Sequence, residues 1–277
     1  MNDVIINIYR TIFSRRMFYR FNYHVYKMSL RGLGVFNSEG NASTGETHFL
    51  QYLAKKIKVK TIFDVGANDG GYATEVRSYF PKAEIYSFEP HPLTFKLLQE
   101  KAKTYNLKTY NYAVGSGSER VLLWDFADDA ALKDTQPTSA LASIHKDVIE
   151  NFHHQKAQSF EVKQIKLDSF VKKNKINEID FLKIDTEGYE YEVLKGAKKL
   201  IEESRIHVIQ FEFNEMNAYG KIFLKDFVDI LDGYTFYRLM PKGFMALKTY
   251  RPITHEIFGF QNIIAVSKKY QKYFSEL

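Results

Sequence analysis

The chain has 277 residues and a formal net charge of +6, and its hydrophobic (45%) and charged (26%) fractions are ordinary for a globular protein. It contains no cysteine, which excludes disulfides, zinc–thiolate sites, iron–sulfur clusters and thiol nucleophiles. The positive charge is concentrated at the N-terminus. Residues 1–37 hold six Arg and Lys against one Asp, a formal charge of +5, and the remaining residues are nearly neutral.

The N-terminal segment combines aromatic and basic side chains, and residues 3–28 predict a helix whose faces are not cleanly separated. A glycine-rich loop follows, so we interpret residues 1–45 as an extension of a domain over residues 46–277. Three interpretations stay open: a helix packed on the domain, a helix on an anionic membrane surface, or a nucleic-acid-binding segment without a recognised motif. The longest apolar stretch is too short to span a bilayer and no signal peptide follows. We therefore expect a cytoplasmic protein, peripheral at the inner membrane surface if the second interpretation holds.

From residue 46 onward, predicted strands and helices alternate, which is typical of right-handed crossovers and a mostly parallel sheet. The expected strands are 61–65, 84–88, 108–114, 180–184, 207–213, 235–239 and 262–266, and the expected helices are 46–57, 72–80, 92–105, 189–203 and 222–231. Residues 116–170 interrupt this order. There VLLWDF and the alternating FEVKQIKL, which suggests an edge strand, flank a loop-like segment over residues 127–145.

The stretch TIFDVGANDGG ends an apolar strand in an acid and then enters a helix through glycines. In parallel sheets ligands bind at the carboxyl ends of the strands, and the first turn brings backbone close to them. Gly66 and Gly70 permit that approach, and the Asp64 carboxylate could bind a cationic amine or another polar group. The next strand also ends in an acid, Glu89, which is placed to bind both hydroxyls of a ribose. Together these signals predict a nucleoside cofactor rather than a simple tight turn.

The spacing of this turn, Gly66-x-Asn68-x-Gly70, differs from the G-x-G-x-x-G of dinucleotide sites, where a pyrophosphate sits on the helix N-terminus. The acids Asp64 and Asp69 make the turn negative. This suits a cofactor that has a cationic centre and no phosphate, which describes S-adenosylmethionine. An NAD-dependent oxidoreductase is the alternative, and the spacing disfavours it.

A second acid-rich constellation follows the fourth expected strand. Lys183 and Asp185 have the same parity, so both can reach one side of its carboxyl end, and Glu212 and Asn214 end the neighbouring strand. Methyl transfer from a sulfonium requires in-line alignment and removal of a proton from the acceptor hydroxyl. The candidate catalytic residues are therefore Asp185, Lys183 and Glu212, with His145 of the inserted region as a further candidate base.

Five motifs together resemble the FkbM family of S-adenosylmethionine-dependent methyltransferases over about residues 45–267: DVGANDGGYA, FEPHP, NYAVGSG, KLDSF and IDFLKIDTEGYEYEVLKGA. The resemblance implies an α/β class I Rossmann-like fold. Its sheet would be seven-stranded and mostly parallel, with an antiparallel last strand and flanking helices.

The same resemblance implies roles for individual residues of the cofactor site. Asp64 and Gly66 would line the methionine end, with Asn68 and Gly70 in the same turn, and Glu89 would bind the ribose. Ala113 and Val114 would lie against the adenine. KIDTEG, which contains Asp185, would form the floor of the methyl-transfer site and contact the cofactor there. The cofactor-binding set is therefore Asp64, Gly66, Asn68, Gly70, Glu89, Ala113, Val114 and Asp185.

The acceptor side is less defined. Asp185, Glu212 and Asn214 resemble the ligand set of magnesium-dependent O-methyltransferases, and oxygen ligands suit Mg²⁺; the alternative is a structural salt bridge between Glu212 and Lys183. The resemblance indicates O-methylation of a sugar hydroxyl in a cell-surface glycan or a related small-molecule acceptor. A nucleic-acid methyltransferase is a further alternative, but DTEG stands where amino-methylating enzymes commonly carry an Asp/Asn-Pro-Pro-aromatic motif. No nucleic-acid partner is expected, the oligomeric state stays open, and residues 116–170 are expected to shape the acceptor pocket.

Overall fold

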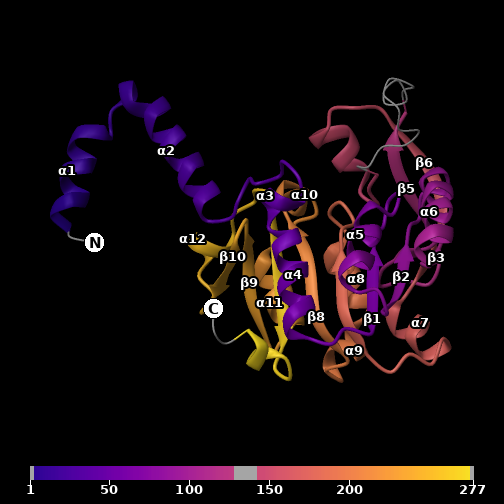
Figure 1. Cartoon of the computed structure of the whole chain (residues 1–277). Helices are drawn as coiled ribbons and strands as arrows, with labels where there is room; N and C mark the ends of the chain where they lie inside the picture. The colour runs from indigo at the N-terminus through magenta and orange to yellow at the C-terminus, as the bar shows by residue number, and fades with distance from the viewer. Residues whose placement is uncertain (1–2, 128–141, 275–277) are drawn as a thin grey trace.

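The computed structural model describes residues 3–127 and 142–274, and its centre is a large sheet with helices on both faces (Figure 1). Eight strands form this sheet in the order β10-β9-β11-β8-β7-β1-β2-β3. They are β1 Thr61–Val65, β2 Glu84–Phe88, β3 Lys108–Tyr110, β7 Ile179–Ile184, β8 Ile206–Phe213, β9 Tyr234–Met240, β10 Gly243–Leu247 and β11 Gln261–Ser267. Neighbours from β3 to β8 are parallel, and β11 is antiparallel to both β8 and β9. The predicted fold class, a mostly parallel sheet with an antiparallel last strand, is confirmed, but the sheet has eight strands where seven were predicted.

The central strands are buried on both faces, so they supply two separate cores. The first lies under helices α7 (Leu167–Lys173), α8 (Glu190–Gly196), α9 (Lys198–Glu202) and α11 (Leu224–Ile230). The second lies under α4 (Glu46–Lys56), α5 (Gly71–Tyr79) and α6 (Pro92–Tyr105). The shorter helices are α3 (Asn41–Thr44), α10 (Glu215–Tyr219), α12 (Pro252–His255) and η4 (Gln271–Tyr273). Polar side chains are costly within these cores, and the buried ones occur at both ends of the strands.

Two expected elements are divided in the structure. The expected strand 108–114 ends at Tyr110, because Ala113–Val114 forms β4 and pairs with β6 (Ala157–Ile165) in a second sheet. The expected helix 189–203 breaks between α8 and α9 at Ala197. Just before this break, a Cβ on Gly196 would lie 2.1 Å from the carbonyl oxygen of Gly115. At both interruptions the chain contacts residues that are distant in the sequence. Such contacts cannot be predicted from local periodicity.

The inserted region forms a three-stranded sheet in the order β4-β6-β5, in which β5 (Arg120–Phe126) is antiparallel to β6. Both strand-like stretches are therefore strands, but β6 is the middle strand and not an edge. The π-helix η3 (Val148–Phe152) lies between them in the chain. Most of the expected loop 127–145 lies outside the described residues. The strand β10, which pairs with β9, was not predicted.

The N-terminal extension forms an arm that stands away from the sheet (Figure 1). The single helix expected over residues 3–28 is divided into α1 (Asp3–Phe13), η1 (Arg16–Phe18) and α2 (Tyr19–Gly32), because Arg15 is extended. None of the residues of α1 is buried, and Leu30 is the one buried residue of α2. The interpretation of the extension as a helix packed on the domain is therefore wrong. Within the described residues, no helix has the length and apolarity that crossing a membrane requires.

The base of the arm is attached at the carboxyl end of β9. A Cβ on Gly34 would lie 2.5 Å from the carbonyl oxygen of Leu239, and one on Gly45 would lie 2.3 Å from that of Met240. The N–H of Phe36 donates to the carbonyl of Phe260 (2.8 Å). Because β9 runs parallel to β8, the arm emerges at the sheet edge where β1, β7 and β8 end.

Candidate active site

A cavity lies at the carboxyl ends of β1, β2 and β7. Six of the eight residues predicted to bind the cofactor line it: Gly66, Asn68, Glu89, Ala113, Val114 and Asp185. Asp64 lies outside the lining, and Gly70 is the N-cap of α5. The inserted region contributes Leu123, Ala142 and Ile144 to the wall beside Ala113. The structure thus brings most of the predicted residues together around one apolar-walled space.

The turn after β1 leaves no room for a side chain at its first glycine. Gly66 has a φ of 80°, and a Cβ there would lie 1.7 Å from the carbonyl oxygen of Asp185. The N–H groups of Gly66 and Ala67 both donate to the carbonyl of Phe88, at 3.0 and 2.9 Å. The turn is thereby held against the ends of both neighbouring strands, and only glycine fits its first position.

Glu89 is buried at the end of β2, with both carboxyl oxygens placed by backbone. One oxygen accepts the N–H of Asn68 (2.9 Å) and the other accepts the N–H of His91 (2.7 Å). Burial raises the pKa of Glu89 to about 7, although these two hydrogen bonds oppose the shift. Each oxygen keeps acceptor capacity, so the carboxylate can accept two hydroxyls from the cavity.

Asp64 and Lys183 are adjacent across β1 and β7 and are almost fully buried. Neither oxygen of Asp64 has a hydrogen-bond partner among the described residues. Burial raises its pKa to about 6, against the opposing charge of Lys183. Lys183 Nζ lies 2.6 Å from the Asp185 carboxylate and 4.5 Å from the centre of the Tyr72 ring. Burial lowers the pKa of Lys183, but its carboxylate neighbours outweigh burial and hold it above the usual range.

A third buried acid, Glu46 of α4, joins this group. It accepts hydrogen bonds from Thr44 (2.9 Å) and from Gln210 of β8 (2.6 Å), and Tyr72 of α5 donates to the same Gln210 (3.1 Å). Burial raises the pKa of Glu46. One buried lysine therefore faces the carboxyls of Glu46, Asp64 and Asp185, and the group has an excess of negative charge.

The turn after β7 presents Glu187 to the cavity in a left-handed conformation, with a φ of 53°. Glu190 holds the turn, because its carboxylate accepts the N–H groups of Thr186 (2.9 Å) and Gly188 (3.2 Å). The hydroxyl of Ser143 in the inserted region donates to the Glu187 carbonyl (2.8 Å). Among the described residues, no hydrogen bond or ion pair engages the Glu187 carboxyl. A non-glycine residue held in this conformation and left unpaired is typical of a functional position.

Glu212 and Asn214 end β8 at the same edge. Burial and the carboxylates of Asp185 and Glu187 raise the pKa of Glu212 well above its usual value. The side-chain oxygen of Asn214 accepts the N–H of Met216 (2.9 Å) as the N-cap of α10, and its amide donates to Glu212 (3.4 Å). Because Lys183 pairs with Asp185 and the described residues contain no Glu212–Lys183 ion pair, the structure does not form the alternative salt bridge.

His145 lies next to the cavity but not in its lining. Its ring is 5.6 Å from that of Tyr189, which does line the cavity. Burial lowers the pKa of His145, and the carboxylates of Glu192 and Asp147 oppose this effect. The imidazole is therefore neutral near pH 7, and its ring contacts that of Tyr189 at the cavity wall.

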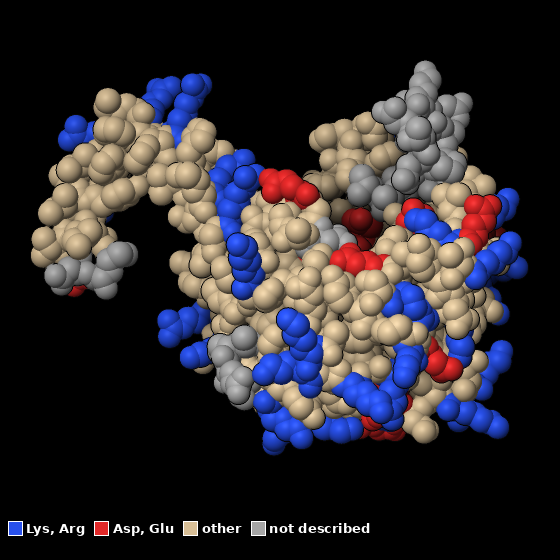
Figure 2. All heavy atoms as spheres, viewed as in Figure 1, with Lys and Arg blue, Asp and Glu red and all other residues tan. Residues whose placement is uncertain are grey.

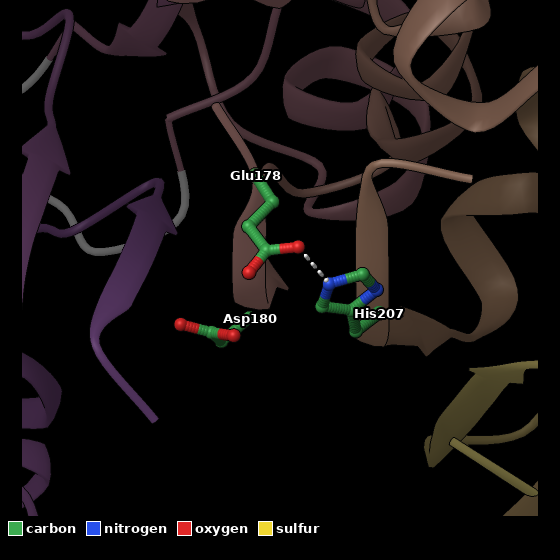
Figure 3. Close-up of side chains that lie close together, drawn as sticks. All are labelled: Glu178, Asp180 and His207. Atoms are coloured by element: carbon green, nitrogen blue, oxygen red, sulfur yellow. Dashed lines mark hydrogen bonds and ion pairs between the residues drawn. The ribbon is translucent and has the colours of Figure 1, made fainter. Parts of the chain in front are cut away.

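A different cluster of metal-ligand side chains lies at the opposite edge of the sheet. Glu178, Asp180 and His207 are grouped at the start of β7 and β8 (Figure 3). Glu178 lies 2.8 Å from His207 Nε2 and 3.3 Å from Lys269, and Asp180 accepts the backbone N–H groups of Lys60 and Thr61. Protein donors already engage one oxygen of each carboxylate, so the cluster is explained as a structural network.

Comparison with known proteins decides the family. The family model for the methyltransferase FkbM domain matches residues 64–236, which is more than half of the chain. The chain belongs to the FkbM methyltransferase family. The match contains both strand-end acids, Asp64 and Glu89, and the whole turn after β7.

Two curated relatives are similar to this FkbM chain at low identity. It is 22% identical over 184 residues to the 2-O-methyltransferase NoeI of Sinorhizobium fredii, covering 66% of this chain and 75% of that protein. It is 24% identical over 168 residues to the hexuronic acid methyltransferase AglP of Haloferax volcanii, covering 60% of this chain and 62% of that protein. Among solved structures, precorrin-6y C5,15-methyltransferase from Geobacter metallireducens matches with a TM-score of 0.41 and 12% identity, over 80% of this chain and 88% of that one.

As an FkbM methyltransferase, the chain uses S-adenosylmethionine, which supplies a methyl group on a positively charged sulfur. The residues of the cavity are compatible with this cofactor: the Glu89 carboxylate could accept two ribose hydroxyls, and Ala113 and Val114 are apolar residues of the lining against which an adenine could pack. The carboxyls grouped around Lys183 suit the cationic end. The family assignment removes the alternative of an NAD-dependent oxidoreductase.

We expect the affinity for S-adenosylmethionine to fall as the pH decreases through about 7, because Glu89 accepts two hydroxyls only when it is ionised. Glu89→Gln should weaken binding at high pH by about 1–3 kcal/mol and flatten this pH dependence. Titration calorimetry at several pH values measures both effects. Glu84→Gln, at the exposed start of the same strand, is the matched control. An unchanged pH profile in Glu89→Gln would contradict the ribose assignment.

Sequence reasoning missed Glu46, Gln210 and Tyr72 as site residues. Glu187 was expected at the site only as part of the KIDTEG motif, and no separate role was predicted for it. Glu46 and Gln210 lie 164 residues apart, and no local pattern connects them.

Proposed function

We propose that this methyltransferase transfers the methyl group of S-adenosylmethionine to a sugar hydroxyl of a cell-surface glycan or a related small acceptor. The family assignment supplies the reaction. The names of the two relatives, a 2-O-methyltransferase and a hexuronic acid methyltransferase, support a hydroxyl and a sugar as the acceptor. Two weak similarities support an acceptor class and not a particular compound.

The observation that carries this proposal is the group of acids Asp185, Glu187 and Glu212, which we call the acid-rich rim. Asp185 and Glu187 line the cavity, and Glu212 is close enough to both for their charges to raise its pKa. Carboxyls are good acceptors for the many hydroxyls of a sugar. Lys183, a buried cation beside them, is already paired with Asp185. No Lys or Arg is among the described residues that line the cavity to pair with a uronate, so we infer an uncharged sugar.

The proton of the acceptor hydroxyl goes to a rim carboxylate in this proposal. Lys183 is unsuited as a base, because its carboxylate neighbours keep it protonated. Asp185 is engaged by Lys183, and the carboxylates that act on His145 are those of Glu192 and Asp147, which lie outside the cavity lining. Of the predicted catalytic residues, Glu212 is the proposed base: it lies outside the cavity lining, but the carboxylates of Asp185 and Glu187, which do line it, act on its carboxyl, and its raised pKa makes it the stronger proton acceptor once it is ionised. S-adenosylmethionine, which Glu89 and the turn after β1 would hold, would supply the methyl group on a cationic sulfur, and the rim carboxylate would take the proton of the hydroxyl that accepts the methyl group.

The magnesium site stays a prediction. Asp185, Glu212 and Asn214 are its proposed ligands, but Asn214 already uses its oxygen to cap α10. Carboxylates and an amide oxygen would suit Mg²⁺, which would help to orient the acceptor hydroxyl. Full activity after exhaustive chelation would exclude a metal requirement.

The test is a panel assay with purified full-length protein and S-adenosylmethionine. Neutral hexosides, uronides and nucleosides are offered separately, and mass spectrometry detects the gain of one methylene mass. We expect methylation of neutral hexosides. Methylation confined to uronides would overturn the uncharged acceptor, and methylation of nucleosides alone would overturn the sugar. Comparing surface glycans from cells with and without the gene then identifies the natural acceptor.

A further inference from the structure

The arm exposes apolar side chains that the described part of the protein does not cover. Large hydrophobic residues that are exposed number 19 in the described chain, and 13 of them lie between Val4 and Leu33. They are Val4, Ile5, Ile6, Ile8, Tyr9, Ile12, Met17, Tyr19, Phe21, Tyr23, Tyr26, Met28 and Leu33. Such a concentration on a soluble surface marks an interaction site.

Helix α1 is strongly amphipathic. At about 100° per residue, its apolar side chains occupy one continuous arc and its polar side chains the other. The apolar arc holds Val4, Ile5, Ile6, Ile8, Tyr9, Ile12 and Phe13, and the polar arc holds Asp3, Asn7, Arg10 and Thr11. This division belongs to a helix that lies with one side in an apolar phase and the other in water.

Helix α2 adds a basic stripe. Arg20, Lys27 and Arg31 are spaced at i, i+7 and i+11, so they share one face, and all three are exposed. Three further arginines lie at positions 10, 15 and 16. Asp3 is the single acid of residues 1–37. Figure 2 shows blue atoms along the upper side of the arm and tan atoms over much of the rest. Apolar and cationic groups are thus combined on one projecting element.

The arm and the cavity share one edge of the molecule. The base of the arm is held at the carboxyl end of β9, and the cavity lies at the carboxyl ends of β1, β2 and β7. A surface that binds the arm therefore lies on the same side of the sheet as the active site.

We propose that the arm docks the protein on an anionic lipid bilayer. The apolar face of α1 enters the boundary between headgroups and acyl chains, and the basic stripe of α2 lies among the anionic headgroups. The composition of the arm favours a bilayer over two other partners, a second copy of the chain and a nucleic acid. A second copy would bring two arms of formal charge +5 together, and a nucleic acid would not use the isoleucine face. This inference does not depend on the identity of the acceptor.

The experiment is vesicle flotation with the full chain, using neutral phosphatidylcholine vesicles and vesicles that also contain phosphatidylglycerol. We expect binding to the anionic vesicles that weakens with salt. Ile8→Gln should lower the partition by about tenfold or more, and Thr11→Gln, on the polar face of the same helix, is the matched control. Both sites are exposed, so the fold is retained.

A second pair of variants tests the charge. Removing Arg20, Lys27 and Arg31 together should lower anionic binding by about fivefold per charge. Changing Lys172, Lys173 and Lys175, which are exposed on the body, removes the same charge and should have little effect. The proposal would be overturned if the protein bound neutral vesicles as strongly as anionic ones. It would also be overturned if the control triple variant lost as much binding as the variant without Arg20, Lys27 and Arg31. Arm-dependent dimers without vesicle binding, seen by light scattering, would assign the arm to a second copy. Cofactor affinity stays unchanged in every variant, which separates this outcome from a failure of the proposed function.

Discussion

Gly66→Ala is expected to abolish measurable S-adenosylmethionine binding and to destabilise the fold. The new Cβ would lie 1.7 Å from the carbonyl oxygen of Asp185 and 2.7 Å from its carbonyl carbon, so backbone has to move. The left-handed conformation costs an L-residue about 1–2 kcal/mol, and overpacking adds about 1–3 kcal/mol. Any relaxation separates the turn after β1 from the turn after β7, which form adjoining walls of the cavity.

The matched control is Gly243→Ala in β10, where a Cβ meets nothing within 4 Å. Thermal unfolding and calorimetric cofactor titration of both variants measure the two effects. The control should behave like the wild type in both. If Gly66→Ala keeps the wild-type affinity, the turn is not part of the cofactor site.

The sequence predicted the cofactor half of the site well because its signals are local. An acid at the end of a strand and a glycine immediately after it both reflect the backbone at that position. Asp64 and Glu89 accordingly lie at the ends of β1 and β2, whose observed bounds equal the expected ones. The order of strands followed from their alternation with helices, since right-handed crossovers leave few topologies.

Tertiary packing determined what the sequence did not predict. Glu46 enters the buried charged group from a helix that precedes β1, and Gln210 joins it from β8. The chain after β3 turns into a second sheet because β6 offers β4 a partner from fifty residues further on. The capping role of Asn214 had a local signal, because Asn is favoured at helix starts. We interpreted Asn214 as a metal ligand instead and did not predict the cap. Periodicity predicted a helix of aromatic and basic residues at the N-terminus, with faces that were not cleanly separated. Periodicity does not say whether the apolar side chains of such a helix have a partner.

Lys183→Met is expected to lower the free energy of unfolding by about 3–5 kcal/mol, the range for removing one partner of a buried ion pair. Methionine keeps the length and apolar stem of lysine, so the change removes mainly the charge. Three carboxyls, those of Glu46, Asp64 and Asp185, then lose the one buried cation beside them. Surface pairs are worth much less, and Lys101→Met, which breaks a partly exposed pair with Asp69, should cost about 1 kcal/mol or less.

The pH dependence of the stability loss in Lys183→Met shows whether Lys183 stabilises the fold through its charge or through its packing. In the wild type Asp64 has a pKa of about 6, which includes the favourable charge of Lys183, so loss of that charge raises the pKa further. A carboxyl whose folded pKa is raised binds protons more strongly when folded, so the stability of the variant falls as pH increases. Urea unfolding at about pH 5 and about pH 8 should therefore give the larger loss at the higher pH. A loss that is equal at both values would mean that Lys183 supports the site through packing on Tyr72, and that the carboxyls are neutralised in another way.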